Sequence, residues 1–202
     1  MTNPETGWIL GPTMSVKALE GFDDLIARLD SAVSAGDVPT ITSRLKHELE
    51  ALTGSGMHLP DHLRRPRPDA YARRLLHRDT ARGYTAVVMT WAPGQRTALH
   101  DHAGIWCVEG VVEGNMNVTR YELIAEHDGS YSFADRGSVR AGVGSAGALI
   151  PPFEYHTLGN ALTDRPSITL HVYGGEMDHC HVFDPRPDGS YARVFHSLSY
   201  DD

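Results

Sequence analysis

From residue 71 to residue 184 the chain is a succession of short β-rich runs separated by turn residues. Such spacing is typical of an antiparallel sandwich or barrel and constrains the fold more than any other feature of the sequence. We place strands at residues 73–77, 85–91, 97–102, 105–112, 115–123, 131–133, 138–141, 148–151, 156–160, 167–173 and 181–184. The predicted fold is therefore mainly β, a small antiparallel β-barrel or jelly roll.

Two amphipathic patterns precede the barrel. Apolar residues recur at three- and four-residue steps over residues 16–33 and again over 39–52, which predicts an N-terminal pair of α-helices. Residues 1–14 have no usable periodicity and are expected to form an extended tail, and a proline-punctuated connector covers 59–68. We therefore divide the chain into residues 1–68, a tail and helical prefix packed on the barrel, and residues 69–202, the barrel, within one structural domain.

Composition excludes several classes of function. A chain of 202 residues with a formal net charge of −8 has room for one full core and shows no basic footprint for nucleic acid. Neither an apolar run of the roughly 20 residues that a membrane span requires nor a leader pattern is visible. We expect a cytoplasmic protein, monomeric or weakly homo-oligomeric, without nucleic-acid or membrane partners. Its two cysteines, Cys107 and Cys180, are too few for a disulfide framework and are expected to be reduced.

Two histidines, His100 and His102, are spaced i and i+2 in a segment whose neighbours are predicted strands. Alternate residues of a strand point to the same face, about 6 to 7 Å apart, so the two imidazoles can converge on one cation. We predict a metal site there. The alternative is a pair of polar barrel contacts without metal.

The spacing around these histidines resembles the first motif of the cupin β-barrels. It reads Gly94-x5-His100-x-His102-x4-Cys107-x6-Gly114, with Cys107 at the position where most cupins have a glutamate ligand. A second segment, Pro151-x4-His156-x3-Asn160, resembles the second cupin motif, although Phe153 replaces its usual glycine. The resemblance makes His156 the third ligand and implies a cupin fold with an all-histidine site.

Three neutral imidazoles leave the charge of a metal uncompensated and several coordination positions open. Such a site suits an anionic, chelating substrate. Imidazole binds iron, zinc, nickel and copper alike, so the residues around the site must decide the metal.

A polar row follows on the strand predicted at 167–173. Alternation places Thr169, His171 and Tyr173 on one face and apolar residues on the other. A hydrogen bond from Thr169 to His171, with His171 in turn positioning the Tyr173 hydroxyl, would form a relay beside the metal. The alternative is the exposed polar face of an edge strand.

Together, the HDH segment at 100–102, Cys107, the EG pair at 113–114, His156 and the polar row resemble the thiol dioxygenases of the cysteine dioxygenase family. The resemblance covers about residues 59–184. It implies that His100, His102 and His156 bind Fe(II) and that a thiol and O2 react to give a sulfinic acid. Residues Thr169, His171, Tyr173 and Cys107 would then be catalytic, with Cys107 and Tyr173 matching the pair that a thioether joins in mammalian-type members. A buried cysteine used only for packing is the alternative for Cys107.

The residues that set the substrate point in two directions. Arg73 stands where cysteine-specific members of the family have an arginine that binds the substrate carboxylate, and Tyr173 would contact the substrate as well. In the 3-mercaptopropionate branch that position is usually glutamine, yet the HVYGG stretch at 171–175 and the WAPGQ stretch at 91–95 resemble that branch. Our first hypothesis is a dioxygenase of L-cysteine that forms cysteine sulfinic acid, and the alternative substrate is 3-mercaptopropionate or a related mercapto acid.

Other interpretations are weaker. The His179-Cys180-His181 cluster resembles a ligand set, but adjacent strand residues alternate faces. Glu109 shares the strand parity of Cys107 and is an alternative carboxylate ligand, although it lies two residues beyond the position of the motif glutamate. A different metal-dependent cupin enzyme and a cupin that only binds a ligand are the non-family alternatives.

Overall fold

The computed structural model describes residues 16–202, with side chains from residue 21, so the tail expected at 1–14 lies outside the described residues. The helical elements are α1 (Val16–Val33), α2 (Val38–Gly54) and the short 3-10 helix η1 (Asp61–Arg64). The strands are β1 (Ala72–Asp79), β2 (Tyr84–Trp91), β3 (Cys107–Glu113), β4 (Asn115–His127), β5 (Ser130–Gly142), β6 (Ala146–Leu149), β7 (His156–Asn160), β8 (Ser167–Tyr173), β9 (His179–Pro185) and β10 (Tyr191–Ser197). Both predicted helices are confirmed within two residues at each end.

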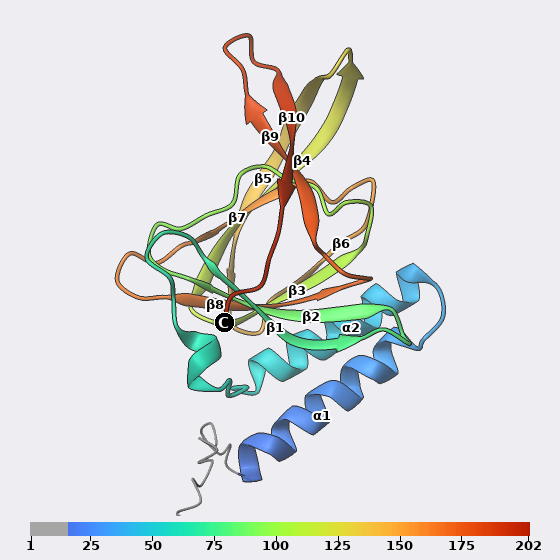
Figure 1. The fold of residues 1–202 in the computed structure, drawn as a ribbon, viewed down its shortest axis with the longest axis vertical. Coiled ribbons are helices and arrows are strands. Elements are labelled where there is room, and N and C mark those ends of the chain that lie inside the picture. The colour runs from blue at the N-terminus through green and yellow to red at the C-terminus, as the bar shows by residue number, and fades with distance from the viewer. Residues whose placement is uncertain (1–15) are drawn as a thin grey trace, which may run out of the picture.

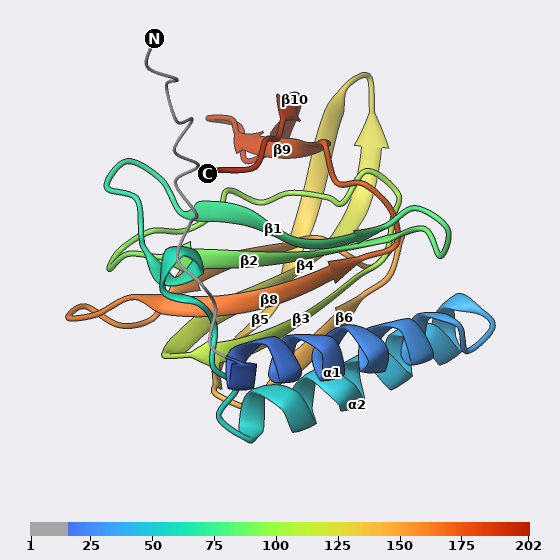
Figure 2. The same cartoon turned by 60° about the horizontal axis from the view of Figure 1, so that its bottom comes forward.

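The strands form two antiparallel sheets of five strands each, in the orders β1-β2-β8-β3-β6 and β7-β4-β5-β10-β9. The two sheets face each other, and α1 and α2 lie side by side beneath the first sheet (Figure 1). Turning the molecule shows both helices running along the outer face of that sheet (Figure 2). The mainly β fold class, an antiparallel barrel with an N-terminal helix pair, is therefore confirmed.

Three strand predictions need correction. The two short strands predicted at 131–133 and 138–141 are one long strand, β5. It contains a bulge in which Arg136 and Gly137 lie opposite Arg120 of β4, and the Gly137 amide donates to the Asp135 carboxylate. The strand predicted at 97–102 is a loop with isolated bridges. Strand β10 was not predicted; five of its seven residues are exposed, so the usual apolar alternation is weak there.

The helix α2 begins at a defined cap and buries one face. The Asp37 carboxylate accepts a hydrogen bond from the Thr40 amide at 3.0 Å, which satisfies one of the free N–H groups of the first turn. Leu45, Leu49 and Leu52 then repeat along one side of the helix and are buried between α1 and the sheet. Close packing against β3 depends on Gly110, where an added Cβ would lie 3.2 Å from the Leu49 Cβ.

The helices decide which way the residues of β8 point. Ile168, Leu170 and Val172 pack into the core shared with α1 and α2, so the alternate residues of the strand must face the barrel interior. All seven residues of β8 are consequently buried, and β8 lies at the centre of its sheet. The alternative of an exposed edge strand for the polar row is therefore wrong.

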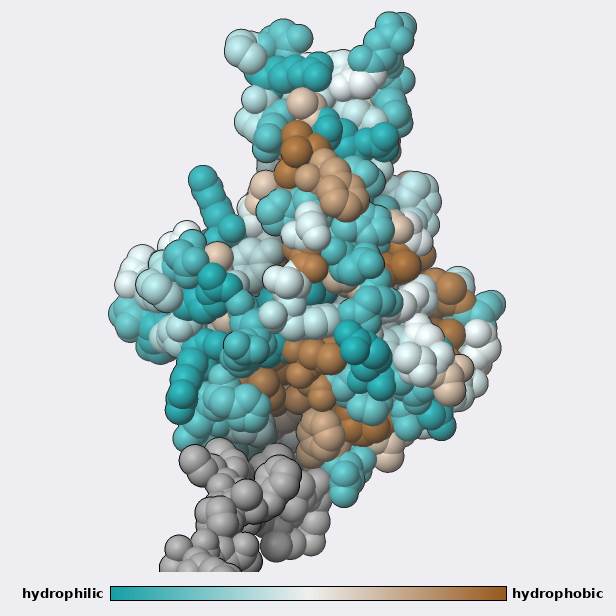
Figure 3. Space-filling model, viewed as in Figure 1, coloured by the Kyte–Doolittle hydropathy of each residue, from teal (hydrophilic) through white to brown (hydrophobic). Residues whose placement is uncertain are grey.

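The surface is mostly hydrophilic over the end of the molecule where the β4–β5 and β9–β10 hairpins project (Figure 3). A small apolar group interrupts it, and the exposed large apolar residues of β10 are Val194 and Phe195. Among the described residues, no helix is both long and apolar enough to cross a membrane.

Leu49 should be a major contributor to stability, because its side chain is fully buried between the helix and β3. Leu49→Ala should lower the free energy of unfolding by about 2 to 5 kcal/mol, the usual cost of a large-to-small change in a core. Urea denaturation followed by circular dichroism measures it. Arg44→Ala, at an exposed position of the same helix, is the control and should change stability by less than about 0.5 kcal/mol.

Candidate metal centre

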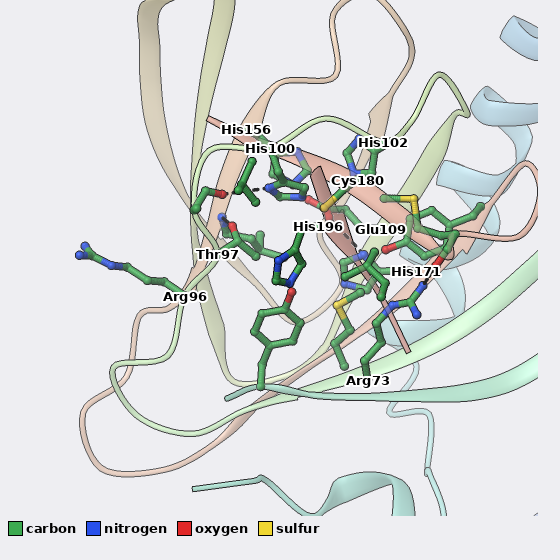
Figure 4. Close-up of a pocket in the computed structure, with 18 of the residues that line it drawn as sticks. Arg73, Arg96, Thr97, His100, His102, Glu109, His156, His171, Cys180 and His196 are labelled. Atoms are coloured by element: carbon green, nitrogen blue, oxygen red, sulfur yellow. Dashed lines mark hydrogen bonds and ion pairs between the residues drawn. The ribbon is translucent and has the colours of Figure 1, made fainter. Parts of the chain in front are cut away.

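The polar residues of β8 and β3 line a cavity of about 280 Å³ between the two sheets. Figure 4 shows His100, His102 and His156 on one side of it and Arg73 and His171 on the other. The volume suits a small molecule of amino-acid size rather than a polymer.

His100, His102 and His156 form a compact cluster. Their ring centroids lie 5.2 Å (His100–His102), 4.6 Å (His100–His156) and 5.1 Å (His102–His156) apart. One ring nitrogen from each falls within 4.8 Å of the others, so three nitrogen donors can reach a single ion. His156 is the first residue of β7, whereas the other two lie in the connection between β2 and β3.

The convergence of His100 and His102 does not come from strand alternation, so that part of the sequence argument is wrong. His100 forms isolated antiparallel bridges to His156 and to Val182, with its amide 3.3 Å from the His156 carbonyl. A turn then follows, with positive φ at Ala103 (52°) and Gly104 (80°). The loop is thus fixed by contacts to β7 and β9 that have no signature in the local sequence.

Asp101, between the two histidines, points away from the cluster and fastens the loop. Its Oδ1 accepts hydrogen bonds from the amides of Ala103 (3.1 Å) and His181 (2.8 Å). Its Oδ2 lies 2.9 Å from the His181 Nδ1. His181 is therefore a partner of Asp101, and its neighbour His179 pairs with Asp178 in the same way at 2.6 Å.

The electrostatics of the cluster suit a metal ion. Burial lowers the pKa of His100, and burial together with the neighbouring imidazoles lowers the pKa of His102 and His156 well below the usual value. All three rings are therefore neutral near pH 7, the form that binds metals. Nδ1 of His102 and Nδ1 of His156 are buried without a hydrogen-bond partner among the described residues, a costly state that metal binding and its supporting contacts would relieve. The donor set fits a metal that accepts imidazole ligands, such as iron(II).

The polar row of β8 faces a matching row on β3. Cys107 is the cross-strand partner of Tyr173, and Glu109 is the partner of His171. The predicted bond between Thr169 Oγ1 and His171 Nε2 is present at 2.7 Å. The predicted continuation to Tyr173 is wrong, because His171 and Tyr173 are stacked rings with centroids 6.0 Å apart. The hydrogen-bonded chain runs the other way, from Trp91 Nε1 to Thr169 Oγ1 at 2.9 Å.

The environment of Cys107 and Tyr173 keeps both groups protonated. Burial, with Glu109 nearby, raises the pKa of the Cys107 thiol well above its usual value. Burial and the neighbouring thiol do the same to the pKa of the Tyr173 hydroxyl. The two residues are therefore uncharged, and they are cross-strand neighbours.

Arg73 lines the cavity, but the end of the chain already holds part of its guanidinium. Nη2 donates to the Met177 carbonyl at 2.6 Å and Nη1 to the Ser199 carbonyl at 3.3 Å, while the group lies 4.5 Å above the Tyr200 ring. Nε is buried without a partner among the described residues. Nε and the second hydrogen of each terminal nitrogen are the donors left for a ligand.

Several residues of the cavity wall were not predicted. The wall includes His196 and Leu198, which the sequence analysis missed because it placed no strand at β10. Arg96 also borders the cavity, and Figure 4 shows its side chain pointing away from the three histidines. Glu109 lines the cavity beside His171 and belongs with Cys107 and His171 rather than with the histidine cluster.

Comparison with known proteins gives the family. Residues 66–186, more than half of the chain, match the family model described as cysteine dioxygenase type I. The chain therefore belongs to the cysteine dioxygenase type I family.

The curated relatives are distant. Cysteine dioxygenase type 1 from Homo sapiens is 26% identical over 130 residues, and the protein of the same name from Rattus norvegicus is 22% identical over 129 residues. Each alignment covers 63% of this chain and 63% of the relative, so less than two thirds of the relative's length is matched.

Two solved structures are similar to part of this chain. The Thermus thermophilus protein TT1209 is 19% identical, with a TM-score of 0.44 over 58% of this chain and 95% of its own. A conserved protein with a double-stranded β-helix domain from Klebsiella pneumoniae subsp. pneumoniae is also 19% identical, with a TM-score of 0.45 over 60% of this chain and 85% of its own.

Asp101 should set the metal affinity without binding the metal. Asp101→Asn removes the charge that holds His181 and weakens the loop that carries His100 and His102, so metal affinity should fall about 10- to 100-fold. Competition with a chromogenic chelator measures it. The control is Asp178→Asn, which removes a similar acid–histidine pair that does not contact the loop. Equal affinities for the wild type and Asp101→Asn would contradict the role given to Asp101.

Proposed function

We propose that the protein is an iron(II)-dependent thiol dioxygenase that adds both atoms of O2 to the sulfur of L-cysteine and forms cysteine sulfinic acid. The observation that carries the proposal is the cluster of His100, His102 and His156 facing Arg73 across one small cavity. Membership in the cysteine dioxygenase type I family supports it. The partners are then a small thiol and O2, and a cytoplasmic location and a monomeric or weakly associated state stay predictions.

The three histidines would hold the metal through neutral nitrogen donors. Bound iron(II) would supply the redox chemistry that lets a thiolate react with dioxygen. The overall reaction converts a thiol and O2 into a sulfinate and one proton. Because three imidazoles bring no negative charge, the site favours an anionic ligand such as a thiolate.

Arg73 would bind the substrate carboxylate through the donors that Met177 and Ser199 leave free. The wall around it is apolar and buried, which strengthens a charge-assisted hydrogen bond. Tyr173 would contribute an un-ionised hydroxyl near the substrate. Thr169 and His171 would support the β8 side of the cavity, because Trp91 is hydrogen-bonded to Thr169 and Thr169 is hydrogen-bonded to the His171 ring.

3-Mercaptopropionate, or a related mercapto acid, is the second candidate substrate. The WAPGQ and HVYGG stretches favour it, because they resemble the branch of the family that uses that thiol. A different metal-dependent cupin enzyme and a ligand-binding cupin are the alternatives outside the family.

The purified protein should contain about one iron(II) per chain, and His156→Ala should lose both the metal and thiol-dependent oxygen consumption, because two imidazoles bind iron weakly. Metal analysis and an oxygen electrode measure the two properties. His179→Ala, at a half-buried histidine on β9 that pairs with Asp178, is the control and should retain both. Full activity in a zinc-loaded, iron-free protein would rule out the mechanism, since zinc has no redox chemistry.

A Cys107–Tyr173 thioether, if it forms, should lower the intact mass by about two hydrogens, because the thiol and a ring C–H both lose one. Mass spectrometry under reducing conditions measures this. Cys107→Ser should abolish the mass difference, whereas Cys180→Ser, at the other buried cysteine, should preserve it. An unmodified mass in fully active enzyme would show that Cys107 only packs.

Tyr173→Phe should keep the metal and slow turnover about tenfold or more.

Arg73 should set the substrate preference. The wild type should prefer L-cysteine to 3-mercaptopropionate in kcat/KM. Arg73→Gln should reduce kcat/KM for L-cysteine about 10- to 100-fold, the effect of losing about 1.5 to 3 kcal/mol from a charge-assisted pair, and shift preference toward 3-mercaptopropionate. Arg136→Gln, at the surface of β5, is the control. A wild-type preference for 3-mercaptopropionate would promote the second candidate.

A further inference from the structure

Glu109 lies in the wall between two cavities. It lines the metal cavity, and it also lines a second cavity of about 610 Å³ whose other lining residues come mainly from β3, β4, β5 and β6. The second cavity reaches the surface, because its lining includes the exposed residues Lys46, Arg120 and Arg140. We call it the outer cavity. Gly147, the partner of Glu109 on β6, leaves this approach open, since an added Cβ there would have nothing within 4 Å.

The carboxyl group of Glu109 has few polar neighbours. Glu109 is only 8% exposed, and its Oε2 has no hydrogen-bond partner among the described residues. Nδ1 of His171 lies 3.4 Å from Oε2. An ionisable group that is buried, unsatisfied and open to a cavity on each side is costly for a purely structural role.

The hydrogen-bonded row fixes the proton on the side of His171 that faces Glu109. The Trp91 indole can only donate, so the Thr169 hydroxyl accepts from it. Thr169 then gives its own hydrogen to His171 Nε2, the arrangement that uses every hydrogen of the row. In this arrangement the imidazole proton is on Nδ1, which lies 3.4 Å from the Glu109 Oε2 and 4.0 Å from the Cys107 Sγ.

The buried environment of Glu109 gives it a pKa at which it can exchange a proton near neutral pH. Burial raises its pKa to about 7. Burial and the Arg73 charge lower the pKa of His171 to about 3, so that ring is neutral and does not lock Glu109 in the ionised form. The other groups facing Glu109 are the protonated Cys107 and Tyr173 inside the barrel and the cations of the outer cavity, Lys46, Arg120 and Arg140.

We propose that Glu109 is the proton acceptor of the reaction, which takes the proton of the substrate thiol in the metal cavity and releases it to water in the outer cavity. The proposal rests on the proposed function. The S–H bond breaks and an O–H bond forms on Glu109, which leaves a thiolate and a carboxylic acid. No electrons are exchanged in this step. The acid then returns the proton to water and becomes a carboxylate again, which accounts for the one proton that sulfinate formation releases in each turnover.

In this scheme His171 is a positioning residue, because its Nδ1 lies beside the Glu109 carboxylate, 3.4 Å from Oε2. Glu109 is the residue that exchanges the proton with the substrate, directly or through one water. A pKa near the working pH is what an efficient general base requires.

The test uses cobalt(II)-loaded protein without oxygen, so that thiolate binding is followed by absorbance in a stopped-flow instrument and no turnover is needed. The variant is Glu109→Gln, which keeps the shape and cannot accept a proton. Glu113→Gln is the matched control, since Glu113 is on the same strand and pairs with Arg64 at the surface. L-Cysteine and 3-mercaptopropionate are both used, because only the first carries an amine.

Glu109→Gln should slow thiolate binding at pH 7 by at least tenfold with both thiols, within the usual range for loss of a general base. The wild-type rate should rise with pH around an apparent pKa near 7, and this step should disappear in the variant. Glu113→Gln should stay within twofold of the wild type. A rate for Glu109→Gln within twofold of the wild type, or a loss confined to L-cysteine, would overturn the proposal, the latter because it would make Glu109 a partner of the amine.

A second variant tests the outer cavity and does not touch the metal cavity. Gly147→Val should fill the approach to Glu109, leave the rate of the first thiolate binding unchanged and slow steady-state sulfinate formation by the iron-loaded protein. An unchanged steady-state rate would overturn release through the outer cavity.

The two proposals fail in different ways. Suppose that the wild type makes no sulfinate from either thiol while the rate of thiolate binding by the cobalt protein still depends on Glu109. The proposed dioxygenase function is then wrong, and the assignment of Glu109 as the acceptor of the thiol proton stands. If the wild-type cobalt protein binds neither thiol, both are wrong.

Discussion

Burial of both faces of β8 is the constraint on which the rest of the structure depends. The apolar alternate residues of β8 pack on α1 and α2, and a strand has only two faces, so Thr169, His171 and Tyr173 have to enter the barrel. Polar groups inside a barrel are stable only with partners, which here are one another, Trp91 and the residues of β3 opposite them. The helix pair thus determines the chemistry of a cavity that it does not touch.

The side of the cavity that carries the three histidines is built differently from the side of β8 and β3. On the side of β8 and β3 the geometry comes from a regular ladder of strand hydrogen bonds. On the other side, His100 and His102 lie in a loop that Asp101 fastens to β9 and that bridges to β7. A ladder fixes side chains through many repeated hydrogen bonds, and a loop depends on a few individual ones. Single substitutions far from the three histidines can therefore change the positions of these histidines more than they change the positions of the β8 side chains.

The sequence predicted what depends on local periodicity. Both helices and the inward direction of the β8 row follow from spacing, and both are found. The meeting of His100, His102 and His156 is also found, but it was predicted correctly only by the resemblance to the cupin motifs and not by strand alternation. What depends on distant segments was missed. The local pattern around Asp101 contains no signal for its bonds to His181, and nothing near Arg73 indicates that the carbonyls of Met177 and Ser199 occupy its guanidinium. A signal existed for β10: Pro187-Asp188-Gly189 is turn chemistry between two possible strands.

The contacts of Arg73 also impose an order of assembly. The Asp201 amide donates to the Arg73 carbonyl, and the Leu198 amide donates to the Asp178 carbonyl. The Tyr200 ring lies under the guanidinium. Residues 198–201 therefore complete the wall around an arginine that is synthesised more than a hundred positions earlier. A chain growing from its N-terminus has all three histidines before it has this wall. The cluster of three histidines can therefore form before the wall around Arg73 is complete, and a product truncated before Leu198 would contain the histidines but lack Ser199 and Tyr200.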